Sequence, residues 1–195
     1  MALFAVVVLV AGCDLGRPDP LLDGPPVPAQ VGGAIPLTPV NDPVDLTSFR
    51  VDPCGSLKRE DVAALIIDPP DQVNPSRADS APTGCSWYIW RGPLLSVRLP
   101  AGKEKTLVEL AALSERDPGL YPGWQELSIG GLPAAQYRLS GDMKSCDLVV
   151  GMADDAALTF GYRVGGEDSS QYWGADRCAA VFKAAELVIG NLRAR

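Results

Sequence analysis

The later part of the chain predicts an α+β fold, an antiparallel sheet of about six strands with helices packed on one face. Three observations support this prediction. Six short runs of apolar and β-branched residues follow one another, turn-forming residues separate several of them, and three segments with helical periodicity lie before, between and after them. Strands joined by short turns pair antiparallel, which leaves the helices to cover the sheet.

Helices are expected at residues 57–67, 106–117 and 176–192. The first must end before Pro69, because proline lacks the backbone N–H that a helix uses. Thr106 and Glu109 give the second helix the spacing of a capping box, in which each side chain accepts a hydrogen bond from the other residue's backbone N–H. The carboxylate of Asp176 is expected to cap the third helix.

The strands are expected at residues 85–90, 94–99, 124–129, 134–140, 146–153 and 156–164. Turn signals stand between several of them, such as Gly130 with Gly131 and Asp154 with Asp155. Residues 68–83 carry prolines and are expected to form a loop. Residues 52–195 are long enough for one domain with one core, so we predict a single α+β domain over this range.

The N-terminus predicts a lipoprotein signal peptide over residues 1–13. Residues 1–10 contain no polar side chain and lead through small residues to Cys13, the pattern of a lipobox. The apolar run is about half of the ~18 residues that a spanning helix needs. No Lys or Arg precedes it, which a true start codon further upstream would explain. The alternative is an apolar strand whose cysteine is accidental.

We therefore expect Cys13 to become the first residue and to carry acyl chains such as palmitate. The protein would then be lipid-anchored at the extracytoplasmic face of the cell membrane. Residues 14–51 contain many prolines and no sustained apolar period. Such a segment buries too little surface to offset its chain entropy, so it is expected to be a disordered tether.

Four further cysteines, Cys54, Cys85, Cys146 and Cys178, predict two disulfides in an exported protein. Zinc is the alternative, but the cysteines lack the close spacing of a zinc knuckle and the chain has no histidine. Of the three possible pairings we favour Cys54 with Cys85 and Cys146 with Cys178. Each of these joins a helix start to a strand start and avoids a long crossing of the sheet.

The composition excludes several kinds of function. Without histidine the chain can form no imidazole-based triad and no histidine metal centre. A net charge of −7 argues against nucleic-acid binding. Neighbouring acids such as Asp154 and Asp155 do not face each other across a cleft, and the aspartates of residues 68–79 lack the spacing of a calcium loop. We expect no catalytic residue, no metal and no cofactor, and hence no enzyme.

Aromatic residues and arginines on the predicted strands suggest a binding surface instead. Alternation places Cys85, Trp87 and Ile89 on one face of their strand and the residues between them on the other. Either set could face the helices. The candidate ligand-binding residues are Tyr88, Trp90, Arg98, Arg138 and Arg163. The alternative is that loops such as residues 68–83 cover this face.

Four motifs resemble the family of actinobacterial lipoproteins known as domain of unknown function 3558. They are Asp52-Pro53-Cys54, Gly84-Cys85-Ser86-Trp87, Gly131-Leu132-Pro133-Ala134 and the last helix with its Cys178. The resemblance covers residues 52–195 and the lipobox. It implies an envelope lipoprotein with a Mog1/PsbP-like sandwich and supplies no activity. One departure is Lys58 where such domains have a capping Ser or Thr, so we expect a frayed helix start or a cap from Ser56.

Two functions remain as hypotheses. The first is a non-catalytic domain that binds an envelope lipid, glycan or protein, and the second is a structural or accessory subunit of an envelope complex. In both cases the membrane is a partner through the lipid anchor, and we expect a monomer. A deep pocket favours the first hypothesis and a flat exposed patch favours the second.

Overall fold

The computed structural model describes residues 37, 39–66, 73–78, 83–89, 92–138, 145–163 and 177–195. The predicted signal peptide with Cys13 and most of the predicted tether lie outside these residues. So do Trp90, Asp176 and the aspartates of the loop that we weighed as a calcium site. In the described part of the chain, no helix combines the length and the apolarity needed to cross a membrane.

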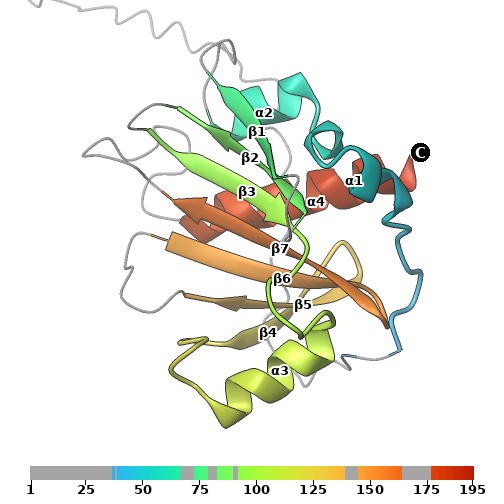
Figure 1. Cartoon of the computed structure of the whole chain (residues 1–195), viewed down its shortest axis with the longest axis vertical. Coiled ribbons are helices and arrows are strands. Elements are labelled where there is room, and N and C mark those ends of the chain that lie inside the picture. Colours follow the sequence, from blue (N-terminus) through green and yellow to red (C-terminus); the bar gives the residue numbers. More distant parts are fainter. Residues whose placement is uncertain are drawn as a thin grey trace, which may run out of the picture.

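The fold is α+β and is built on a seven-stranded antiparallel sheet, which confirms the predicted class (Figure 1). The strands are β1 (Asn74–Ala78), β2 (Gly84–Tyr88), β3 (Leu94–Arg98), β4 (Gln125–Ile129), β5 (Leu132–Tyr137), β6 (Ser145–Ala153) and β7 (Ala156–Arg163). Their order across the sheet is β1-β2-β3-β7-β6-β5-β4. Gly130 and Gly131 adopt positive φ angles between β4 and β5, as a two-residue hairpin turn requires.

Strand β1 lies inside residues 68–83, which the sequence predicted to be a loop. It pairs antiparallel with β2, with Pro75 opposite Trp87, and forms one edge of the sheet. Proline cannot donate to a ladder and is tolerated on edge strands, and the described side chains of β1 are exposed. A polar, proline-bearing edge strand lacks the apolar alternation by which the other strands were predicted.

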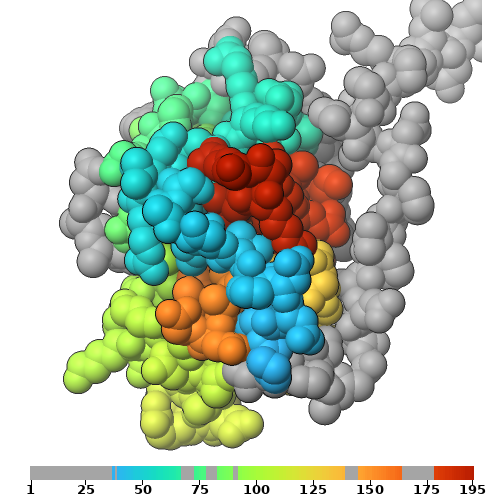
Figure 2. Space-filling model, turned by 90° about the vertical axis from the view of Figure 1, so that its right-hand side faces the viewer, coloured from blue at the N-terminus to red at the C-terminus, as the bar shows by residue number. Residues whose placement is uncertain are grey.

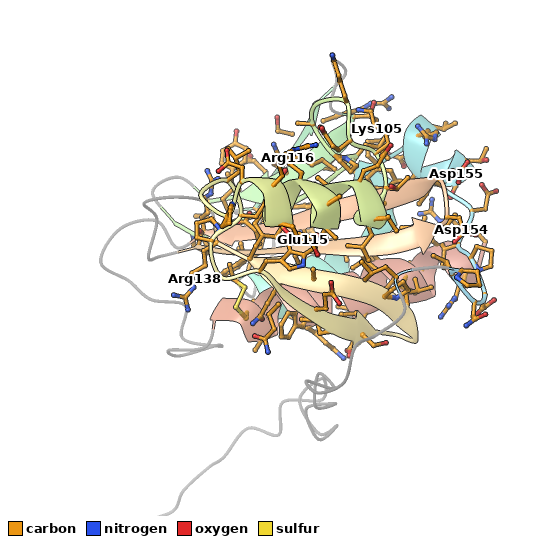
Figure 3. All side chains as sticks on the ribbon, turned by 90° about the horizontal axis from the view of Figure 1, so that it is seen from below. Lys105, Glu115, Arg116, Arg138, Asp154 and Asp155 are labelled. Carbon is orange, nitrogen blue, oxygen red and sulfur yellow. A yellow bond between two sulfur atoms is a disulfide. The ribbon has the colours of Figure 1, made fainter. Side chains whose placement is uncertain are left out.

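The helices lie on both faces of the sheet rather than on one. They are α1 (Thr47–Val51), the short 3₁₀ helix η1 (Cys54–Ser56), α2 (Arg59–Leu65), α3 (Leu107–Arg116) and α4 (Arg177–Arg193). Helix α4 packs on β6 and β7, and α2 packs on α4. Helix α3 packs on β5 and β6 from the opposite side, so the molecule has three layers over these strands (Figures 1 and 3).

Alternation along the strands produces two cores. Leu158, Phe160 and Tyr162 of β7 point towards α4 and belong to the main core, where each is at most 1% exposed. On the other face a smaller cluster fills the space beneath α3. Its buried members are Leu107, Leu110, Ala135, Tyr137, Val149 and Ala157. The amphipathic face of α3 was predictable, but the choice of sheet face was not.

The domain begins earlier than residue 52, the predicted boundary of the tether. Val44 is buried and its N–H donates to Met152 O at 2.8 Å, and Phe49 of α1 is fully buried. Figure 2 shows this N-terminal segment, coloured blue to cyan, lying against the turn between β6 and β7 and against α4. The apolar residues of 40–49 are spaced irregularly around Pro43 and two aspartates, so they show no period, yet the main core buries them.

The two predicted disulfides are present with the predicted pairing. Cys54 of η1 bonds to Cys85 of β2, and Cys146 of β6 bonds to Cys178 of α4. Each bond ties a strand to a helical element on the α4 side of the sheet. The two bonds are offset by two residues along the strands, because Cys85 aligns through Val97 with Phe160 of β7 while Cys146 pairs with Tyr162.

The capping box predicted at α3 is present, whereas the cap that Ser56 was expected to provide at α2 is not. At the start of α3, Thr106 Oγ1 accepts from Glu109 N at 3.2 Å and Glu109 Oε2 accepts from Thr106 N at 3.0 Å. Backbone hydrogen bonds from Lys105 and Thr106 lower the pKa of Glu109. At α2 the hydroxyl of Ser56 donates to Pro53 O and provides no cap. Asp61 instead accepts from Lys58 N at 2.9 Å.

Candidate functional site

One part of the sheet has no described helix over it. Strands β2, β3 and β7 turn their apolar residues towards α4, and their alternate residues, with those that stand opposite them on β1, face the other side. We call this second set the polar face. Its members are Asn74, Ser76, Ser86, Tyr88, Leu94, Ser96, Arg98, Thr159, Gly161 and Arg163. Of the two alternatives for β2, therefore, Cys85 and Trp87 face the helices and Tyr88 faces away.

A row of hydroxyl groups crosses the middle of the polar face. Ser76 of β1 stands opposite Ser86 of β2, and Ser86 stands opposite Ser96 of β3. Neighbouring strands lie about 4.8 Å apart, so the three hydroxyls form a regular line of hydrogen-bonding groups. Ser76 is exposed, Ser86 is half-buried and Ser96 is buried, so the line descends from the edge of the sheet towards its centre.

The row continues through Gly161 to Asp147 of β6. A Cβ atom at Gly161 would lie 2.9 Å from Asp147 Oδ1 and 3.1 Å from Ser96 Oγ. The absence of a side chain at Gly161 therefore leaves space on β7 for the side chains of Asp147 and Ser96, which approach from the two neighbouring strands. Asp147 is 6% exposed, so it belongs to the sheet rather than to the surface that a ligand would reach.

Two arginines stand beside this row. Arg98 is half-buried at the C-terminal end of β3, and Arg163 is exposed at the end of β7. Gly84 lies opposite Arg98, and a Cβ atom there would collide with Cβ of the arginine, so only glycine lets the Arg98 side chain pass. Within the described residues neither guanidinium forms an ion pair with a carboxylate. Both remain able to bind an anion.

The structure places three of the five predicted binding residues on one sheet face, with Tyr88 and Arg163 at one end of the strands and Arg98 at the other. Tyr88 is half-buried opposite Leu94, and Leu94 is opposite Arg163, so Tyr88 and Arg163 lie two strands apart on the polar face. Arg98 shares that face. Trp90 is outside the described residues.

Arg138 is separated from the other predicted residues. It follows β5, is exposed, and lines a cavity with Gln136 and Cys178 on the α4 side. Figure 3 places it at the end of the sheet opposite Asp154 and Asp155. Side chains alternate between the two faces of a strand. Tyr137 points into the cluster under α3, so Gln136 and Arg138 on either side of it point the other way.

An aromatic cluster that sequence reasoning missed lies beside α3. Trp124 stacks on Tyr137 with ring centroids 6.0 Å apart, and Tyr121 meets both rings edge to face. Burial raises the pKa of Tyr137, and the neighbouring Asp147 raises it further. Two of the three rings lie before β4 in a turn-rich segment, where no strand or helix period relates them to Tyr137. Their mutual contacts fix the approach of that segment to β5.

A wider hollow of about 730 Å³ lies between the N-terminal segment and the end of α4. Across it Arg193 contacts Asp42, with Nη2 and Oδ2 2.8 Å apart, and donates to Gly130 O at 3.2 Å. Val40 N donates to Asp154 Oδ1 at 2.7 Å close by. These groups bind one another, so we interpret the hollow as part of the attachment of residues 40–52 to the domain.

These features define a class of protein, a disulfide-bonded α+β domain that leaves part of one sheet face polar and free of helices. In the described part of the chain, no group of Cys, Asp and Glu side chains is arranged to hold a metal ion. The model of a family described as protein of unknown function (DUF3558) matches residues 8–191. The chain belongs to this family. No curated protein and no solved structure matches, so the Mog1/PsbP-like relationship stays a prediction.

Proposed function

We propose that this chain is an exported lipoprotein of an actinobacterial cell envelope, anchored by acyl chains on Cys13, with a domain that binds a ligand without transforming it. The family match begins at residue 8 and therefore includes the lipobox, which supports the anchor. The ligand that we propose is anionic and rich in hydroxyl groups, a class that includes acidic and phosphorylated sugars.

The observation that carries this proposal is the composition of the polar face. Arg98 and Arg163 supply positive charge, while the only described carboxylate in the same rows is the buried Asp147. The whole chain has a net charge of −7, so the charge of the polar face is opposite in sign to that of the protein as a whole. The hydroxyls of the exposed Ser76 and the half-buried Ser86 can donate to and accept from sugar hydroxyls, and the guanidinium groups can bind carboxylate or phosphate.

We propose binding rather than catalysis on chemical grounds. Acid–base hydrolysis of a glycoside needs two carboxyl groups on either side of the bond that breaks, and a triad needs a base beside its nucleophile. The chain has no histidine, and Asp147 has no second described carboxylate facing it across the polar face.

Isothermal titration with an oligogalacturonate, and with neutral maltohexaose as the comparison, tests the ligand class. We expect the acidic oligosaccharide to bind, and the double substitution Arg98→Gln with Arg163→Gln to weaken binding at least tenfold. Arg116→Gln is the matched control, because Arg116 is an exposed arginine at the end of α3. Equal binding of the neutral sugar, or unchanged binding by the double variant, would contradict the proposal.

The anchor has a separate test. Cells that express the parent protein and the Cys13→Ala variant are fed an alkyne-bearing palmitate and then fractionated. We expect the label on the parent in the membrane fraction and none on the variant. An unlabelled parent that is recovered with soluble proteins would exclude lipidation.

A protein that co-purifies in fixed stoichiometry from these membranes, with no binding of acidic sugar, would favour the accessory-subunit alternative.

A further inference from the structure

A cavity lies beside Arg138, on the α4 side of the sheet. The cavity measures about 350 Å³, within the lower part of the roughly 300–1,000 Å³ typical of small-molecule sites. It is open to solvent and is separate from the polar face. Its described lining is Pro122, Gly123, Gln125, Gln136, Tyr137, Arg138, Cys146 and Cys178.

A pair of amides forms one wall of the cavity. Gln125 and Gln136 stand directly opposite each other on β4 and β5, and Gln136 Nε2 donates to Gln125 Oε1 at 2.6 Å. Each side-chain amide has both a donor and an acceptor group, so a single bond between them leaves at least one N–H donor and one C=O acceptor for a ligand. A donor next to an acceptor on one strand pair matches the C=O and N–H of a peptide group.

Arg138 supplies the charge at the rim. Its backbone N–H donates to Pro122 O at 2.9 Å, which holds the residue beside the turn that precedes β4. Its side chain is exposed, and its guanidinium forms no ion pair within the described residues. A guanidinium binds a carboxylate through two parallel hydrogen bonds.

The disulfide between Cys146 and Cys178 gives the cavity a surface of low polarity. Cys146 is 1% exposed and Cys178 is half-buried, so Cys178 supplies most of the exposed surface of this disulfide. Pro122 adds further apolar surface. A ligand with a small apolar group next to its polar atoms would therefore be held on three sides.

We propose that this cavity binds the carboxylate end of a peptide or an N-acylated amino acid with a small apolar side chain. The carboxylate pairs with Arg138, the adjacent amide pairs with Gln125 and Gln136, and the side chain contacts the disulfide and Pro122. A phosphate ion shares the charge but lacks the amide and the apolar group, so it is the alternative that a test must separate.

The probes are N-acetylalanine, its neutral counterpart N-acetylalaninamide, and inorganic phosphate. The full domain with both disulfides is titrated with each, while ¹⁵N NMR follows the side-chain amides of Gln125 and Gln136. We expect N-acetylalanine to shift these signals saturably and to bind at least tenfold more tightly than the neutral amide. Arg138→Gln should weaken that binding at least tenfold, whereas the control Arg116→Gln should leave it unchanged.

Three outcomes would overturn the proposal: no saturable shift with N-acetylalanine, equal binding of N-acetylalaninamide, or phosphate binding as tightly as the carboxylate.

The site is independent of the proposed sugar surface. The double Arg98→Gln and Arg163→Gln variant should therefore still bind N-acetylalanine, and Arg138→Gln should still bind the acidic oligosaccharide. Each proposal can fail while the other stands.

Discussion

Strand β7 has one face that packs in the main core and another that belongs to the polar face, for which we propose a role in binding. Leu158, Phe160 and Tyr162 meet α4 and are at most 1% exposed. The residues between and after them, Thr159, Gly161 and Arg163, belong to the polar face. Because strand side chains alternate, residues one position apart have separate roles. Substitutions on one face should therefore change the free energy of unfolding, and substitutions on the other should change binding.

Phe160→Ala should have the largest effect on stability. The side chain is 1% exposed in the main core, and truncation of such a residue costs about 3–5 kcal/mol through lost burial and the cavity that remains. Urea unfolding measures the loss. Thr159→Ala, the neighbour on the polar face, is the control and should cost about 1 kcal/mol or less, mainly through loss of its hydrogen bond to Arg98 O at 3.1 Å. Similar losses for the two variants would refute the contrast between the faces.

Removal of one disulfide should come next. The bonds close loops with sequence separations of 31 and 32 residues, and the chain-entropy model assigns each about 3–4 kcal/mol. We expect Cys54→Ala with Cys85→Ala, and Cys146→Ala with Cys178→Ala, to lower the free energy of unfolding by similar amounts. Loop entropy would not explain a difference of more than about 2 kcal/mol between the two double variants in their loss of stability. Such a difference would show that the disulfides also stabilise different native contacts.

Two glycine substitutions should have smaller effects of opposite sign. Gly161→Ala places a methyl group against Asp147 and Ser96, and the adjustment should cost about 1 kcal/mol. Gly190→Ala in α4 meets no atom within 4 Å, and alanine in place of a helical glycine should stabilise the protein by about 0.5–1 kcal/mol. Thermal unfolding midpoints of the two variants measure these effects. A Gly161→Ala variant more stable than the parent would contradict the crowding described around Gly161.

Arg163→Gln should be the mildest change in stability. Its side chain is exposed and forms no ion pair within the described residues, so the free energy of unfolding should change by less than about 0.5 kcal/mol. Binding of the acidic oligosaccharide should still weaken measurably. A stability loss above about 1 kcal/mol would mean that the residue serves the fold.

Local signals in the sequence predicted the elements that carry them. The capping box at Thr106, the Gly130-Gly131 turn and the spacing of the cysteines each depend on residues close in sequence or on a small set of alternatives. Strand β1 and residues 40–51 carry no such signal. Pro75 and its polar neighbours fit an edge strand only once β2 is beside them, and the isolated apolar residues before Thr47 are buried only by the assembled core.

The candidate binding residues show the same limit. Tyr88 and Arg163 were predicted to share a surface, and their strands do share one, because alternation within a strand is a local property. The position of Arg138 depends on which face of β5 meets α3, and nothing near Arg138 encodes that choice. The amide pair of Gln125 and Gln136 follows from the register of the β4–β5 hairpin, and that register depends on pairing between two strands rather than on a local pattern in either.

The attachment of the N-terminal segment has a mechanical consequence. A pull on the chain before Val40 would first break the hydrogen bonds of Val40 and Val44 and the contact between Asp42 and Arg193, and would then draw Phe49 out of the core. At Cys54 the load would pass through the disulfide into β2. The freed segment of about 14 residues would by then span up to about 50 Å at ~3.5 Å per residue, with the sheet intact. The segment would act as an extensible link between the domain and whatever holds its N-terminus.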